Sequence, residues 1–252
     1  MGKWEDSMNV SIADLERNLS KPRLQAYRNV TTSDTDAICL YIRNMELSYA
    51  LYPVLQSVEV ALRNSLHDAG IQHFGGADWF RNSAVFRLER RERRMLNSAT
   101  NSIWERQGHN IRDIQQGTVQ PPPPPIDDHI TELMFGFWTG LVNAPYQLII
   151  WNTQPGGIDF SQTAFRHAGR ANRQRAVIFP IVNRLRHLRN RISHHEPIFA
   201  WRPALDVEHR NAMQLLSWIS PSIHAITTMT DPFPALHQRL QTHHAPNITV
   251  VP

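Results

Sequence analysis

The sequence is poor in cysteine and in lysine. Cys39 is the single cysteine among 252 residues, so the chain alone cannot form a disulfide or a cysteine-based zinc site, as suits a reducing cytoplasm. Lys3 and Lys21 are the only lysines, so 24 of the 26 basic residues are arginines. Because a GC-rich genome favours arginine codons in any protein, the positions of the arginines are more informative than their number.

The chain also lacks the marks of a disordered, secreted or membrane protein. Hydrophobic residues make up 41% of the sequence and charged residues 19%, which predicts a folded core. The first ten residues have no apolar run of the kind found in a secretory signal. Residues 133–151 carry no charge, but Pro145, two glycines and the absence of flanking basic anchors favour a buried core helix over a membrane span.

The pattern of apolar residues predicts an all-α protein, because strand-like alternation is absent except in the last few residues. The predicted helices cover residues 12–19 (capped by Ser11), 20–28, 35–69 with a break at Pro53, 84–107, 127–142, 161–195 with interruptions near Gly169 and Pro180, and 206–228 with a bend at Pro221. We expect residues 1–30 to form an N-terminal helical extension, residues 31–242 the main helical domain and residues 243–252 a tail. Five consecutive prolines, residues 121–125, predict an extended surface spacer, with a proline-rich ligand as the alternative.

Acidic residues are absent from one long segment, Phe160–His195. It holds eight arginines and four histidines, so it carries +8 while the rest of the chain carries −4. Charge separated in this way is typical of a protein that binds a polyanion, most simply a nucleic acid. A solvated pair of basic helices is the alternative for the charge alone.

Helical geometry divides the end of this segment into two faces. At about 100° per residue, the apolar residues form one stripe, and the polar residues Asn183, His187, Asn190 and His194 fall on the opposite side. His194 therefore faces solvent or a second protein surface. Histidine can transfer the proton of a ribose 2′-hydroxyl or of the leaving group, and Arg189 on the flank can stabilise charge on the phosphate.

Phosphodiester cleavage needs an acid and a base, and one copy of His194 supplies one of them. Two copies of the helix that meet across a dimer axis would supply both. An isologous homodimer with the active site at its interface is therefore the simplest hypothesis.

The segment Arg189–His194 resembles the Arg-Asn-x-x-x-His signature of the HEPN superfamily, and the longer string from Arg189 to Phe199 resembles its Abi-like (abortive infection) branch. Three further segments resemble that branch in the expected order: residues 19–27, 51–66 and 133–138. The resemblance covers most of the chain between about residues 19 and 200.

The resemblance implies a HEPN-like helical bundle with additional N-terminal helices, a homodimer, and a metal-independent endoribonuclease without a cofactor. It implies catalytic roles for Arg189, Asn190 and His194. Supporting roles are expected for Glu59, Arg63 and His195, and substrate binding for Arg184, Arg186, His187 and Arg191. The family's biology, phage defence and toxin–antitoxin growth arrest, implies a cytoplasmic protein whose partners include RNA and an antitoxin or phage-derived trigger.

Two other functions remain open at this point. A non-catalytic RNA-binding or protein-interaction module could use the same scaffold. A metal enzyme could use His194, His195 and Glu196 with His243 and His244, but adjacent helical residues point about 100° apart and no His-Glu-x-x-His spacing occurs. The run Arg87–Arg94 could widen an RNA-binding surface, although Glu89 and Glu92 suit an ordinary solvated helix equally well.

Overall fold

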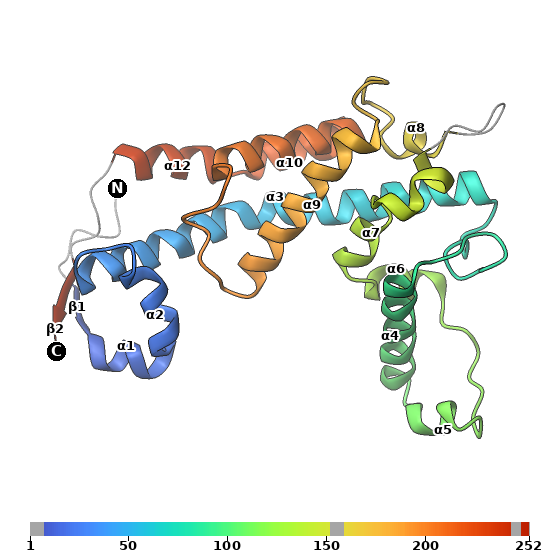
Figure 1. Ribbon diagram of the computed structural model, residues 1–252, viewed down its shortest axis with the longest axis horizontal. Helices are drawn as coiled ribbons and strands as arrows, with labels where there is room; N and C mark the ends of the chain where they lie inside the picture. The colour runs from blue at the N-terminus through green and yellow to red at the C-terminus, as the bar shows by residue number, and fades with distance from the viewer. Residues whose placement is uncertain (1–7, 152–158, 243–247, 252) are drawn as a thin grey trace. The chain divides into compact units, whose positions relative to one another are not determined.

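The computed structural model describes residues 8–151, 159–242 and 248–251, and its architecture is all-α (Figure 1), as the sequence predicted. Its helices are α1 (Ile12–Leu19), α2 (Lys21–Arg28), α3 (Asp34–Phe74), α4 (Arg90–Arg106), α5 (Ile111–Gln115), α6 (Ile126–Glu132), α7 (Phe135–Gly140), α8 (Phe160–Ala164), α9 (Arg175–Ser193), α10 (Leu205–Ile219), α11 (Pro221–Thr230) and α12 (Phe233–Thr242). The chain divides into two compact units. Unit 1 comprises Met1–Leu55, His187–Arg210 and Thr227–Pro252, and unit 2 comprises Gln56–Arg186 and Asn211–Ile226. The domain boundaries expected from the sequence stay a prediction.

Helix α3 continues through the position at which the sequence predicted a break. Pro53 lies inside this helix of 41 residues. A proline in a helix interior removes one backbone hydrogen bond and costs about 3 kcal/mol. The neighbouring side chains of Leu51, Val54 and Val58 are almost completely buried, and this burial offsets the cost.

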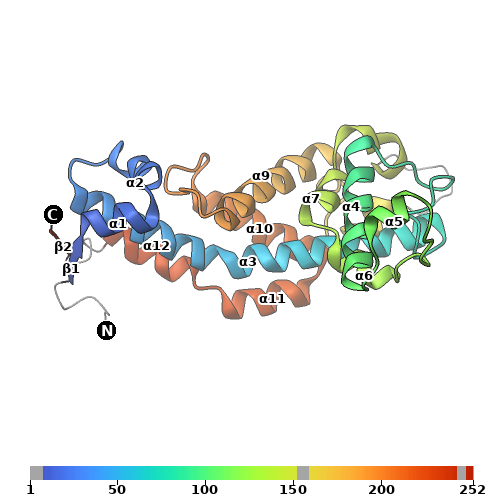
Figure 2. The ribbon, with the colours of Figure 1, turned by 90° about the horizontal axis from the view of Figure 1, so that it is seen from below.

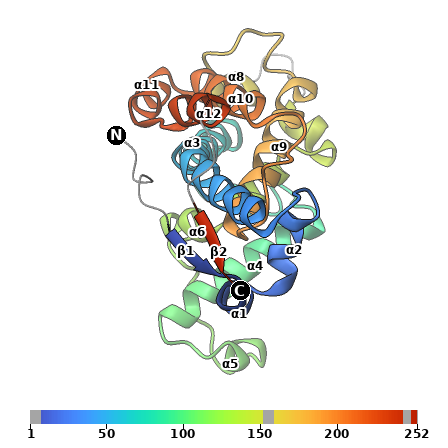
Figure 3. The same cartoon turned by 90° about the vertical axis from the view of Figure 1, so that its left-hand side faces the viewer.

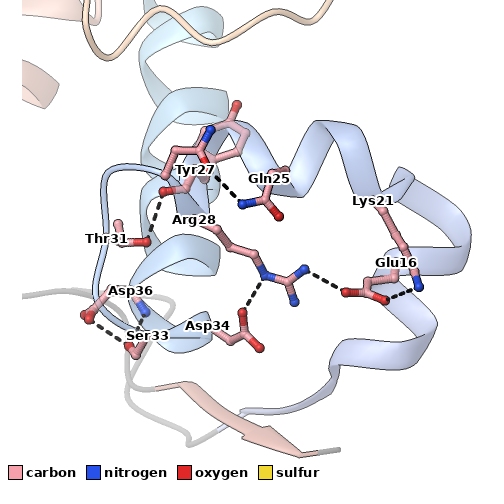
Figure 4. A network of polar contacts seen from close by, with 10 residues as sticks. Glu16, Lys21, Gln25, Tyr27, Arg28, Thr31, Ser33, Asp34 and Asp36 are labelled. Carbon is pink, nitrogen blue, oxygen red and sulfur yellow. Dashed lines mark hydrogen bonds and ion pairs between the residues drawn. The ribbon is translucent and has the colours of Figure 1, made fainter.

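Ionic contacts join the short N-terminal helices of unit 1 to the start of α3 (Figure 4). The side chain of Ser11 accepts a hydrogen bond from the backbone N–H of Asp14 and caps α1, as predicted. The guanidinium of Arg28 donates to Glu16 at 2.7 Å and to Asp34 at 2.6 Å. One arginine of α2 therefore contacts carboxylates of both α1 and α3.

Two short strands, β1 (Met8–Ser11) and β2 (Ile248–Val251), pair in parallel beside these helices (Figure 3). The register pairs Met8 with Ile248 and Ser11 with Val251. Val10 and Val250 pack against the buried side chains of Ile38 and Cys39. Part of the segment expected as a tail thus contributes to the core of unit 1.

In unit 2, α4 packs with α5, α6 and α7 (Figure 2). The predicted helix 84–107 begins only at Arg90. Tyr146 holds the residues before it outside the helix: its ring stacks on the buried Phe86, and its hydroxyl accepts a hydrogen bond from the Glu89 backbone N–H. The predicted helix 127–142 is two helices, α6 and α7, because Leu133 and Met134 between them have an extended backbone. At Gly140 a Cβ atom would come within 2.4 Å of the buried Glu92 carboxylate, so this close approach requires glycine.

The C-terminal helices α10 and α11 meet near Pro221, where the sequence predicted a bend. Helix α12, which the sequence analysis did not predict, follows. Its residue Pro234 lies in the first turn, where the missing N–H has no helical partner to lose. Within the described ranges, none of the helices has the length and apolar character needed to cross a membrane.

Candidate functional site

Helix α9 has the two faces that its sequence predicted. The apolar stripe of Ile181, Leu185, Leu188 and Ile192 is buried. On the other side His187 is exposed, Asn183 and Asn190 are half-buried, and His194 is exposed just beyond the last helical residue. The predicted interruption at Pro180 is absent, whereas Gly169 lies in a turn between α8 and α9.

The helix ends in a Schellman motif that fixes the backbone around His194. The N–H of Glu196 donates to the carbonyl of Arg191 at 2.8 Å, and the N–H of His195 donates to that of Ile192 at 3.0 Å. His195 occupies the left-handed position of this motif with φ of 56°, where glycine is usual. His194 is therefore the last residue before the chain reverses, and its backbone N–H still bonds to the carbonyl of Asn190 at 2.9 Å.

Two helices of unit 1 hold the chain that follows the motif. The guanidinium of Arg23 in α2 donates to the backbone oxygen of His195 at 3.3 Å. The buried side-chain oxygen of Asn44 in α3 accepts the backbone N–H of Ile198 at 2.6 Å. Sequence reasoning missed both residues as parts of the site. Arg23 lies in a segment that carried the family resemblance, but Asn44 gave no signal.

An aromatic cluster packs beside this turn. Tyr27 meets the rings of Tyr41 and Phe199, each at a centroid distance of 5.4 Å. Its hydroxyl is buried and has no hydrogen-bond partner in the part of the chain that the structure describes. Burial raises the pKa of Tyr27 to about 12, although the nearby charges of Arg23 and Arg191 act in the opposite direction. The turn after the motif therefore packs beside uncharged aromatic side chains, with the cationic groups of Arg23 and Arg191 nearby.

Arg191 is one of the residues predicted to bind substrate, and an acidic partner stands close to it. Its Nε lies 3.3 Å from the carboxylate of Glu196 but in poor hydrogen-bond geometry, so we regard the contact as an ion pair only. Both side chains are about half exposed, and such a pair is worth little in water. The Glu196 carboxylate therefore holds the Arg191 side chain only weakly.

The remaining predicted site residues fall in both units. Arg189, Asn190 and His194 lie together at one helix end in unit 1, with Arg189 and Asn190 half-buried. Glu59, Arg63, Arg184 and Arg186 belong to unit 2, and their contribution to the motif stays a prediction. Burial lowers the pKa of Arg186, and the neighbouring charge of Arg91 lowers it further.

Among the described residues no three His, Cys, Asp or Glu side chains are placed so that they could hold a metal ion. His243 and His244 lie outside the described residues.

A family model described as Abi-like protein matches residues 11–200, which includes α1, α3, α7 and the complete motif of α9. Searches of curated proteins and of solved structures give no match.

Proposed function

Because the chain belongs to the Abi-like protein family, we propose that it is a metal-independent endoribonuclease of the HEPN type that acts in phage defence by abortive infection or as a toxin. The observation that carries this proposal is the exposed His194, held at a rigid helix end five residues after Arg189 in a segment without acidic residues. A histidine with a purely structural role would be expected on the buried stripe instead.

The proposed reaction needs only the groups of the RNA and of these side chains. A base removes the proton of the 2′-hydroxyl, whose oxygen attacks the adjacent phosphorus. The bond to the 5′-oxygen of the next nucleotide breaks, and an acid protonates that oxygen as it leaves. The products are a 2′,3′-cyclic phosphate and a 5′-hydroxyl end. Arg189 stabilises the charge that develops on the non-bridging oxygens, and Asn190 orients the phosphate.

The two proton transfers require two groups of opposite protonation state. Each chain contributes one His194, which is exposed and can meet its copy across a two-fold axis. One imidazole then acts as base and the other, protonated, as acid. A homodimer is thus part of the proposal.

The substrate class follows from the charge of the acid-free segment. Arg184, Arg186, His187 and Arg191 would hold phosphates on either side of the cleaved bond, as arginine does well because its fork binds two oxygens at once. The proposed partners are RNA and, by the biology of the family, an antitoxin or a phage-derived trigger in the cytoplasm.

The test is RNA cleavage by the full-length protein in excess EDTA. His194→Gln and Arg189→Ala should each reduce the rate by about a hundredfold or more, which is the usual contribution of a general acid–base group or of a transition-state donor. His167→Gln and Arg170→Ala are matched controls, because both residues are exposed, lie in the same acid-free segment and stand outside the motif.

Each outcome distinguishes one function from the others. EDTA-resistant cleavage that both motif variants lose supports the proposal. RNA binding without cleavage would favour a non-catalytic binding module, and cleavage lost in EDTA would favour a metal enzyme. A monomer by light scattering at high concentration, combined with full activity, would refute the composite site.

A further inference from the structure

A groove of about 430 Å³ lies on the surface of unit 1 between α3 and α12. Tyr49 and Ala50 line it from α3, and Pro232, Ala235 and Leu236 line it from the start of α12 and the residue before it. Tyr49 is 75% exposed, so its ring faces water and is not packed in the core. The groove therefore presents an open apolar surface.

The apolar surface continues along α3 on both sides of the groove. Met45, Tyr49 and Tyr52 recur at i, i+4 and i+7, which places them on one face of the helix, and all three are exposed. A regular apolar stripe of this kind normally packs on the core of its own chain. Tyrosine and methionine are enriched at protein interfaces, and contiguous exposed apolar residues mark interaction sites. This face of α3 therefore suits a protein partner.

Helix α11 is a second apolar element that is exposed. Its ten residues, all of which the structure describes, include no Asp, Glu, Lys or Arg, and Thr227 alone is buried. Ile226 is 60% exposed, and Met229, one turn later on the same face, is 86% exposed. A helix with such a face is of the kind that docks into an apolar groove.

Charge and chain order favour a second copy of this chain as the partner. Glu46 and Arg239, the charged residues that line the groove, form an ion pair of 2.7 Å with each other, so an uncharged helix covers the groove without leaving a buried charge unpaired. Only Asp231 and Pro232 separate α11 from α12, and the Asp231 carboxylate is bonded to His209 at 2.6 Å. Because helix and groove follow each other directly in the chain, one two-fold axis can bring each helix to the groove of the other copy.

We propose that two copies of this chain associate through this surface, with Ile226 and Met229 of one copy against Tyr49 and Leu236 of the other. The contact is isologous, so it occurs twice and closes the dimer. The inference rests on the proposed function for its biological role, because the composite site needs a homodimer. It assigns the association to residues outside the motif.

Sedimentation equilibrium of the full-length protein over a concentration series tests the interface. Met229→Arg and Tyr49→Glu should each raise the dimer Kd by at least about tenfold, because each places an unpaired charge in an apolar contact. An equimolar mixture of the two variants should regain the dimer. In the mixed dimer the new arginine of one chain meets the new glutamate of the other, and the second contact is wild type. This recovery cannot come from misfolded chains.

Leu148→Arg and Val30→Glu are the matched controls. They introduce the same charges at apolar side chains that are also exposed but lie outside α11 and the groove. Each control should dimerise with the Kd of the wild type, and mixing the two should change nothing.

Four results would overturn the assignment. The wild type could stay monomeric at every concentration, which would leave the surface to an unrelated protein. The dimer could be unaffected by Met229→Arg and Tyr49→Glu, it could be weakened equally by the controls, or the mixture of the two variants could stay monomeric. Failure of the proposed function is a separate result, because a wild type that dimerises through this surface but cuts no RNA refutes the endoribonuclease and leaves the interface standing.

Discussion

Replacement of His195 by glycine should stabilise the protein, although it removes a side chain next to the proposed catalytic motif. His195 is the left-handed residue of the Schellman motif that ends α9, with φ of 56°. A side chain in this conformation crowds the following carbonyl oxygen, which glycine avoids. The hydrogen bond from Arg23 ends on the backbone oxygen of His195, so a glycine keeps it.

The magnitude follows from two opposing effects. The left-handed conformation costs a residue with a side chain roughly 1–2 kcal/mol. Glycine loses more conformational freedom on folding, and this costs about 0.5–1 kcal/mol. His195 is exposed, so little burial is lost. The free energy of unfolding should rise by about 0.5–1 kcal/mol, which raises Tm by roughly 1–4 °C for a chain of this size.

Thermal and urea unfolding of the full-length protein would measure this change. Ser193→Gly is the matched control, because Ser193 is exposed two residues earlier in the last helical turn, where glycine should lower the stability by about 0.5–1 kcal/mol. His195→Ala retains the strain and should stay within about 0.5 kcal/mol of the wild type. An unchanged or lower Tm in His195→Gly would refute the assignment of the strained turn. RNA cleavage by His195→Gly and His195→Ala separates a positioning role of the turn from a role of the imidazole, because both variants lack the imidazole and only glycine relaxes the turn.

Three further outcomes are expected. Asn44→Ala should lower the free energy of unfolding in urea by about 1–3 kcal/mol, because it leaves the buried N–H of Ile198 without its acceptor. Burial lowers the pKa values of His67 and His129 below the ordinary 6.5, so the unfolded chain binds protons that the folded chain does not, and urea midpoints should fall as the pH drops below about 6.5. If Arg184 contacts a phosphate of single-stranded RNA, Arg184→Gln should reduce the slope of log affinity against log salt by about 0.7.

Local periodicity was enough to predict the faces of α9. The four residues of its apolar stripe recur at helical spacing, and all of them are buried. The exposure of His194 follows from the same rule, because it lies on the opposite side of the helix. These features depend on residues within one or two helical turns, which the sequence displays directly.

The prolines show that helix breaks cannot be predicted from the local sequence alone. The sequence predicted a break at Pro53, but burial of the surrounding helix offsets the lost hydrogen bond. No helix was predicted around Pro234, yet this residue lies in the first turn of α12, where proline is compatible with a helix. Whether a proline interrupts a helix is decided by its position relative to the helix start and by packing, and neither is visible in a short window of sequence.

The turn after the motif could not be predicted at all. It has a histidine where the usual signal is glycine, so no residue type marks the left-handed position. Its buried acceptor, Asn44, is 154 residues away from Ile198 in the sequence. Contacts at that separation depend on the complete fold.

The same turn connects stability to the proposed chemistry. If the turn served only to end the helix, glycine at residue 195 would make the protein more stable. The sequence has a strained histidine at this position instead. Strain of this kind persists only where the surrounding contacts impose it. The hydrogen bonds from Arg23 to the backbone oxygen of His195 and from the Ile198 N–H to Asn44 hold the chain at and after this residue. If His194 transfers protons, its backbone must keep a fixed position in the complex of the two chains with RNA. The contacts that hold the strained turn supply that rigidity. If His195→Gly lost cleavage while gaining Tm, and His195→Ala kept cleavage, the comparison would show that the strain serves catalysis, because both variants lack the imidazole and only glycine relaxes the turn.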